Sequence, residues 1–306
     1  LVLDEPEPVQ QLAKLFRATP IDTWRAYLTF HYLNGTSDIM PKAFDDASFE
    51  FNGKILFGQQ QQRDRWKRAV LALTGQYGAQ PLAEAVGQLY VRDNFPPSAK
   101  AKVRELVDNI LAAYRSRMQN LDWMTPETRQ AAMRKVNAAH VKIGFPDTWR
   151  DYSTLEIKAG DAYGNRQRAV LWDWMRQAKR MDRKTDKAEW GMAPQTVNAY
   201  YNPMWNEIVF PAAILQAPFF DPNADPAINY GGIGGTIGHE MGHGFDDQGA
   251  KSDENGILHT WWSKQDIDRF NEKAHALAAQ YSQYEPLPGL HINGNFTSGE
   301  NMGDLG

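Results

Sequence analysis

The feature that most constrains this chain is a His-Glu-x-x-His segment, formed by His239, Glu240 and His243. If the segment is helical, the two histidines lie nearly above one another, because residues four apart share a helix face. Their imidazoles can then bind one metal ion, while Glu240 lies beside them and can reach a water on that ion. Neutral nitrogen ligands, an open coordination position and an adjacent carboxylate base are what a zinc hydrolase needs.

A catalytic zinc ion needs a third protein ligand, and spacing sorts the candidates. A histidine six residues after His243 would fit the metzincin pattern, but Gly249 occupies that position. A glutamate about twenty residues further on would fit the thermolysin pattern, yet residues 261–263 are Trp-Trp-Ser. The best remaining candidate is the segment 299–304, which reads Gly-Glu-Asn-Met-Gly-Asp.

If that segment is helical, Glu300 and Asp304 share one face. Glu300 could then bind the metal, while Asp304 accepts the ring N–H of a ligating histidine and fixes its tautomer. Thr297 and Ser298 directly before it are candidate N-caps. Taken alone, the two acidic residues would be read as a solvated helix face. Their combination with the His-Glu-x-x-His segment favours the metal site.

Short sequence blocks follow one another in order along the second half of the chain. They are Asn198-Ala-Tyr-Tyr201, Asn206-Glu-Ile-Val-Phe-Pro211, Pro218-Phe-Phe-Asp221, Asn229-Tyr-Gly-Gly-Ile-Gly234, Gly238-His-Glu, His243-Gly-Phe-Asp-Asp247, Trp261-Trp262 and Gly299-Glu-Asn. This series resembles the neprilysin and endothelin-converting-enzyme family of zinc metallopeptidases. The resemblance is strongest over residues 186–306 and continues more loosely upstream.

The resemblance implies a zincin-type catalytic lobe, part of a helical lobe, and peptide substrates cut on the amino side of large apolar residues. It also implies that the segment around Asn198 and Ala199 is an exposed strand edge, to which the substrate adds as a further strand. These two residues would hold the substrate backbone by hydrogen bonds. A plain structural hairpin is the alternative for this segment.

We expect one zinc ion, bound by His239, His243 and Glu300, with Glu240 as the general base that takes a proton from the attacking water. Asp304 would orient a ligand histidine. Three other functions stay open: another zinc amide hydrolase, a non-catalytic peptide-binding module, and a structural helical protein that carries the motif by chance.

Hydrophobic periodicity predicts a mainly α-helical chain with a small β-sheet. Helices are expected at 10–34 with a break near Pro20, and at 63–73, 98–118, 125–139, 161–181 and 261–280, with Thr125 as an N-cap. Strands are expected at 141–144, 197–201 and 207–210. We place a boundary near Pro146, between part of a helical lobe (1–146) and the catalytic lobe (147–306). The glycine run 231–235 is expected to allow close helix packing rather than to bind phosphate.

Composition limits the partners of the 306-residue chain. Its net charge of −4 gives no reason to expect a nucleic acid, and no apolar run is long enough to span a membrane. The absence of cysteine excludes disulfides and, with the resemblance, indicates a bacterial member. We expect a monomer in the periplasm or outside the cell, with the cytoplasm as the alternative.

The sequence ends at Gly306, two residues after Asp304. Members of the resembled family continue further and supply a histidine that stabilises the oxyanion and an arginine that binds the substrate carbonyl. Neither residue can be assigned here. The resemblance therefore implies a fragment that lacks both ends and is poorly active by itself, because one lost oxyanion donor costs about 10²–10³ in rate.

Overall fold

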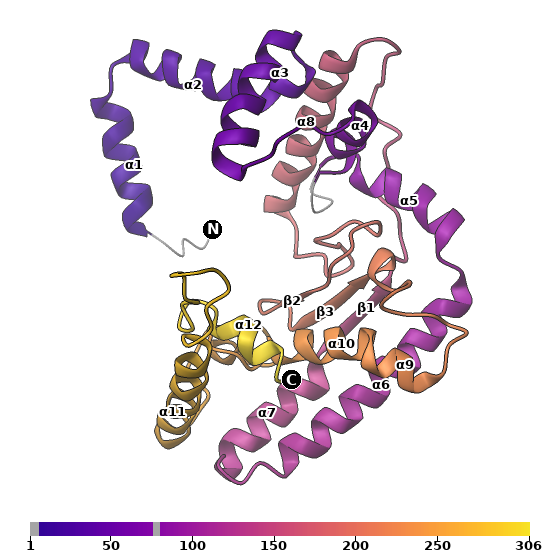
Figure 1. The fold of residues 1–306 in the computed structure, drawn as a ribbon, viewed down its shortest axis with the longest axis vertical. Helices are drawn as coiled ribbons and strands as arrows, with labels where there is room; N and C mark the ends of the chain where they lie inside the picture. Colours follow the sequence, from indigo (N-terminus) through magenta and orange to yellow (C-terminus); the bar gives the residue numbers. More distant parts are fainter. Residues whose placement is uncertain (1–5, 76–79) are drawn as a thin grey trace. The chain divides into compact units, whose positions relative to one another are not determined.

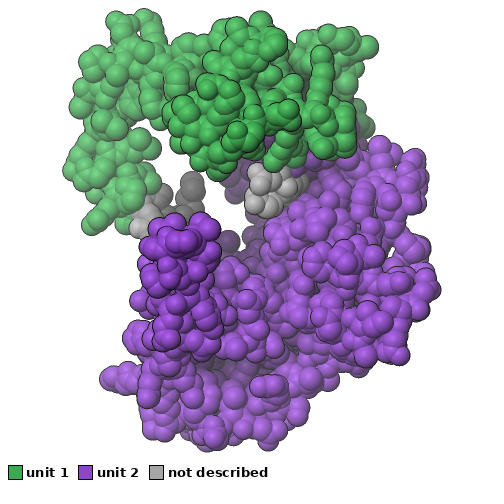
Figure 2. Space-filling model, in the orientation of Figure 1, with its two compact units in different colours: residues 1–71, 153–175 green, residues 72–152, 176–306 purple. Residues whose placement is uncertain are grey.

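The computed structural model describes residues 6–75 and 80–306, which form two compact units (Figure 1; Figure 2). One unit contains residues up to Leu71 together with 153–175, and the other contains residues from Ala72 to Tyr152 together with 176–306. This division differs from the boundary placed near Pro146. The expected mainly helical fold with a small sheet is confirmed.

The first unit consists of helices. They are α1 (Pro6–Ala18), α2 (Ile21–Thr36), a 3-10 turn (Ser37–Ile39), α3 (Lys42–Ser48), a π-helical segment (Phe49–Leu56), and most of α4 (Arg65–Thr74) and α8 (Ala162–Ala178). The expected break near Pro20 is confirmed, because proline lacks the N–H of a helix interior and disfavours helical backbone in the residue before it.

The second unit combines helices with one sheet. Its helices are α5 (Ala83–Asn94), α6 (Pro97–Gln119), α7 (Pro126–Ala138), α9 (Pro226–Gly231), α10 (Ile233–Gly242), α11 (Lys264–Tyr281) and α12 (Ser298–Gly303), with 3-10 turns at Lys179–Asp182, Ala212–Ile214 and Gly249–Lys251. Its strands are β1 (His140–Gly144), β2 (Tyr200–Asn202) and β3 (Glu207–Pro211).

The sheet has the strand order β1-β3-β2. β1 runs parallel to β3 and pairs His140 with Glu207, whereas β2 runs antiparallel to β3 and pairs Tyr200 with Val209. All residues of the central strand β3 are buried. The pairing of β1 with β3 explains why the chain before Pro146 belongs to the unit that carries the His-Glu-x-x-His segment. Within the described residues, β2 is an edge strand.

The core of the second unit fixes α10 between the sheet and α6 (Figure 1). α6 buries its expected apolar stripe, and α10 buries the apolar face opposite its histidines. The residues of this core include Val103, Leu106, Val107 and Leu111 from α6, Ile208 and Phe210 from β3, and Ile233, Ile237 and Met241 from α10. Burying each large apolar side chain stabilises the fold by about 1.5–3 kcal/mol.

Two expected helix caps are not made as such. Thr125 precedes α7 and Thr297 precedes α12, but neither side chain bonds its own helix backbone. The hydroxyl of Thr125 instead donates to Asp266 on α11, and the backbone N–H of Thr125 donates to the same carboxylate at 3.1 Å. Separately, no helix in the described ranges is both long enough and apolar enough for a membrane span.

The close approach of α12 to α10 depends on Gly242. A Cβ there would lie 3.0 Å from the Cα of Gly303. Close packing was expected of the glycine run 231–235, and at Gly231 and Gly235 this is wrong, because a Cβ at either position would meet nothing within 4 Å. The α10–α12 contact carries Glu300 towards the histidines of α10.

We expect Gly242→Ala to lower the free energy of unfolding by about 1–3 kcal/mol, since the added methyl group must displace the backbone of α12. Gly235→Ala is the control on the same helix and should stabilise by about 0.5–1 kcal/mol, because alanine loses less backbone entropy. Chemical denaturation measures both. Equal stabilisation by the two substitutions would contradict the close α10–α12 packing.

Candidate metal centre and catalytic cavity

The two histidines of the motif are presented by the carboxyl end of α10. His239 lies in its last turn and His243 is the residue that caps it. The helical spacing brings the two ring centroids to 4.6 Å from one another. The helix predicted from the sequence thus places both imidazoles on one side, as a shared metal ion requires.

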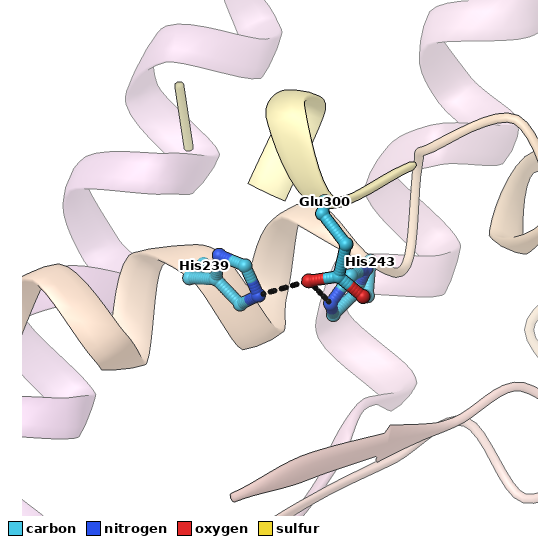
Figure 3. A group of neighbouring side chains, drawn as sticks. All are labelled: His239, His243 and Glu300. Carbon is cyan, nitrogen blue, oxygen red and sulfur yellow. Dashed lines mark ion pairs between the residues drawn. The ribbon is translucent and has the colours of Figure 1, made fainter. Parts of the chain in front are cut away.

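Glu300 reaches the same point from α12. Its Oε2 lies 3.2 Å from His239 Nε2 and 3.7 Å from His243 Nε2 (Figure 3). The three ligand atoms lie within 4.8 Å of one another. Two imidazole nitrogens and one carboxylate oxygen match the donor set of a catalytic zinc site with one open position. The residues present therefore fit a zinc ion.

Two aspartates bond the histidines at Nδ1, the ring nitrogen that does not face Glu300. Asp304 Oδ1 lies 2.9 Å from His239 Nδ1, and Asp246 Oδ2 lies 2.8 Å from His243 Nδ1. A carboxylate at Nδ1 keeps the proton of the neutral ring on that atom. Each Nε2 then has a free lone pair, which can bind a metal ion shared with Glu300. Asp304 therefore lies where the sequence analysis placed it.

Asp246 was missed in the sequence analysis. Its Oδ1 accepts the backbone N–H groups of Gln248 and Gly249, at 2.8 Å and 2.6 Å. Burial alone would raise the pKa of this carboxyl, but the hydrogen bonds from His243 and the backbone hold the pKa below its usual value. The bond to Asp246 in turn raises the pKa of His243. A signal existed, because Asp246 follows His243 by three residues, but spacing did not distinguish it from Asp247.

Glu240 is 5% exposed and lines the cavity beside the two histidines. Burial raises the pKa of its carboxyl to about 6, although the nearby imidazoles of His243 and His239 lower it. A base with a pKa near the working pH transfers protons efficiently. The environment of Glu240 therefore suits a general base.

The three candidate metal ligands line a cavity of about 570 Å³. Asn198 and Ala199 lie on its wall directly before β2, and Tyr200 and Tyr201 of β2 continue that wall. Asn198 is exposed, and its Oδ1 accepts the N–H of Ala199 at 2.9 Å. The highly exposed side chain of Phe296 also lines the cavity. The structure thus brings all seven sequence-predicted site residues into one region of the second unit.

We expect Asp246→Asn to weaken zinc binding about 10–100-fold, because the carboxylate that orients His243 is lost. Asp247→Asn is the matched control, since it removes the same charge one residue away without touching His243. Competition with a chromogenic chelator gives both dissociation constants. Equal zinc affinity in the two variants would show that Asp246 does not support the metal site.

A motif helix with two histidines and a buried glutamate, together with a glutamate from a distant segment, is the arrangement of residues that zinc metallopeptidases use. Comparison with known families agrees. Residues 1–146 and residues 198–306 match the two models described as "Peptidase family M13". The chain belongs to peptidase family M13, as its resemblance to neprilysins and endothelin-converting enzymes indicated.

Individual relatives support this membership. The chain is 37% identical to "Endothelin-converting enzyme homolog" of Locusta migratoria over 92% of the chain and 38% of the relative. It is 32% identical to human "Endothelin-converting enzyme 1" over 100% of the chain and 40% of the relative.

Solved bacterial structures also match. Zinc metalloprotease ZMP1 of Mycobacterium tuberculosis, in complex with an inhibitor, is 47% identical with a TM-score of 0.91, covering 100% of this chain and 46% of that one. PEPO of Lactobacillus rhamnosis is 33% identical with a TM-score of 0.82, covering 96% and 46%. The chain thus spans less than half the length of the relatives named here.

Proposed function

We propose that this chain carries the zinc site of an endopeptidase that hydrolyses oligopeptides at a single zinc ion. His239, His243 and Glu300 would hold the ion, and Glu240 would act as general base. The observation that carries this proposal is the convergence of three ligand atoms within 4.8 Å of one another, at the wall of a cavity shared with a buried glutamate.

Zinc, when bound here, would acidify a water molecule and polarise the scissile carbonyl. Glu240 would accept a proton from the attacking water on its carboxylate and would pass it to the leaving amine. Asp304 and Asp246 keep the protons of the two histidines on Nδ1 throughout. The low exposure of Glu240 excludes bulk water from its carboxylate and so keeps it basic.

The peptide substrate would lie along β2. This strand is bonded to β3 on one side, and its backbone groups on the other side can pair with an added strand. Asn198 and Ala199 precede β2 on the cavity wall and would bind the backbone of the peptide. The aromatic lining, which includes Phe296, suits a large apolar residue on the carboxyl side of the cut bond, the preference that the family resemblance implies.

We expect Glu240→Gln to keep zinc and lose about 10²–10⁴-fold in kcat, because the amide has no proton-accepting carboxylate. The assay is cleavage of a quenched peptide with Phe or Leu after the scissile bond, with bound zinc counted in both proteins. Equal cleavage by the variant would contradict the role of Glu240. Zinc binding without any cleavage by the parent chain would contradict the proposed activity and favour a peptide-binding module.

Activity should fall on the acid side as Glu240 becomes protonated. The carboxyl has a raised pKa of about 6 in the free protein, so its basic form is present above that value and is lost below it. A cation bound beside the Glu240 carboxylate would lower this pKa below about 6. The acid limb of kcat/KM against pH should therefore have its midpoint at or below about 6. A midpoint well above that value would assign the limb to another group.

A further inference from the structure

Lys135 on α7 is a buried cation that lies outside the His-Glu-x-x-His segment. It is 1% exposed, and its ammonium donates to the carbonyl oxygens of Gly249 and Ser252, at 2.6 Å and 2.7 Å. Ser252 Oγ lies 3.4 Å from the same nitrogen. A buried ammonium needs such partners, because an unpaired buried charge strongly destabilises a fold. These partners belong to the segment 249–252, which follows the His-Glu-x-x-His helix.

Three aromatic rings surround the ammonium. Its nitrogen lies 5.8 Å from the ring centroid of Tyr201, 5.6 Å from that of Phe245 and 5.8 Å from that of Trp261. Cation–π attraction is strongest where water is excluded. Burial lowers the pKa of Lys135 to about 8, while the charge of Asp246 and other nearby acids opposes this shift. The side chain is therefore still cationic at neutral pH.

The segment bound by Lys135 is tied directly to a metal ligand. The carbonyl oxygen of Gly249 accepts from the Lys135 ammonium, and the N–H of Gly249 donates to Asp246 Oδ1, each at 2.6 Å. The other oxygen of Asp246 bonds His243 Nδ1 at 2.8 Å. A Cβ on Gly249 would lie 1.9 Å from the carbonyl oxygen of His243. Three hydrogen-bonded steps therefore connect the ammonium with the imidazole.

The backbone of Lys135 also supports a second segment that lines the cavity. Asn206 donates from Nδ2 to the carbonyl oxygen of Lys135 at 2.9 Å, and accepts the hydroxyl of Tyr201 at 2.9 Å. Asn206 is 2% exposed and has a φ of 48°, a left-handed conformation that asparagine tolerates better than most residues. Tyr201 lies on β2 and lines the cavity. Lys135 thus contacts the segment 249–252 and also Asn206, which bonds Tyr201 of β2.

We propose that Lys135 is a positioning residue of the metal centre, whose ammonium holds residues 249–252 so that Asp246 can orient His243. This inference rests on the proposed zinc site and adds a residue more than a hundred positions upstream of the motif. Lys135 contacts neither the metal ligands nor the cavity directly. Its effect therefore passes through Gly249 and Asp246.

The test measures zinc affinity by chelator competition in Lys135→Met, which keeps the length of the side chain and removes its donors. Lys142→Met is the matched control, because Lys142 is another nearly buried lysine, on β1, whose ammonium pairs with the buried carboxylate of Glu207 at 2.8 Å and donates to the carbonyl oxygen of Glu189 at 2.8 Å. Both variants are also combined with Asp246→Asn. Circular dichroism confirms the fold, and the cobalt-substituted proteins report ligand geometry through their visible spectra.

Lys135→Met should raise the zinc dissociation constant about 10-fold and alter the cobalt spectrum, as loss of an outer support does, while Lys142→Met leaves both unchanged. In the Asp246→Asn background the loss should shrink to less than about 2-fold, because the two residues act in series. Lys135→Gln is measured too, in case the Met variant does not fold.

Equal zinc affinity in the lysine variants and the parent, or a full 10-fold loss in the Asp246→Asn background, would overturn the proposal. Failure of both Lys135 variants to fold would also overturn it and make Lys135 a residue of folding alone. Failure of the parent chain to bind zinc would instead contradict the proposed function.

Discussion

The structure of this site depends on the hydrogen bond that each motif histidine makes through Nδ1 to an aspartate. These two bonds leave both Nε2 atoms free, at the one point that Glu300 also reaches. Without them an imidazole could rotate or exchange its tautomer, and the ligands would no longer converge. The packing of α10 and α12 holds the two histidines and Glu300 at this point.

Packing provides that support at two levels. The apolar face of α10 is fixed between α6 and the sheet, and α12 comes close because glycines face each other at Gly242 and Gly303. Burial also gives Glu240 its raised pKa. Burying a carboxylate destabilises a fold. Buried groups with strongly shifted pKa values are commonly found at functional sites. The same core thus raises the pKa of Glu240, the proposed base, and positions the proposed metal ligands.

The sequence predicted the parts of this site that follow helical spacing. His239 and His243 share a helix face, and Glu300 with Asp304 repeat the same spacing, so periodicity was sufficient for them. Asp246 and Lys135 could not be assigned, because their roles depend on a turn and on contacts between distant segments. The boundary expected near Pro146 differs from the limits of the compact units, because strand pairing between distant segments is not visible in local patterns.

X-ray absorption at the zinc edge tests the central claim most directly, because it reports the ligands of the bound ion. The account predicts one zinc ion per chain, with two imidazole nitrogens and a carboxylate oxygen at about 2.0–2.2 Å, and loss of the oxygen contribution from the protein in Glu300→Ala. An identical spectrum for Glu300→Ala, or a shell with a single imidazole, would contradict it.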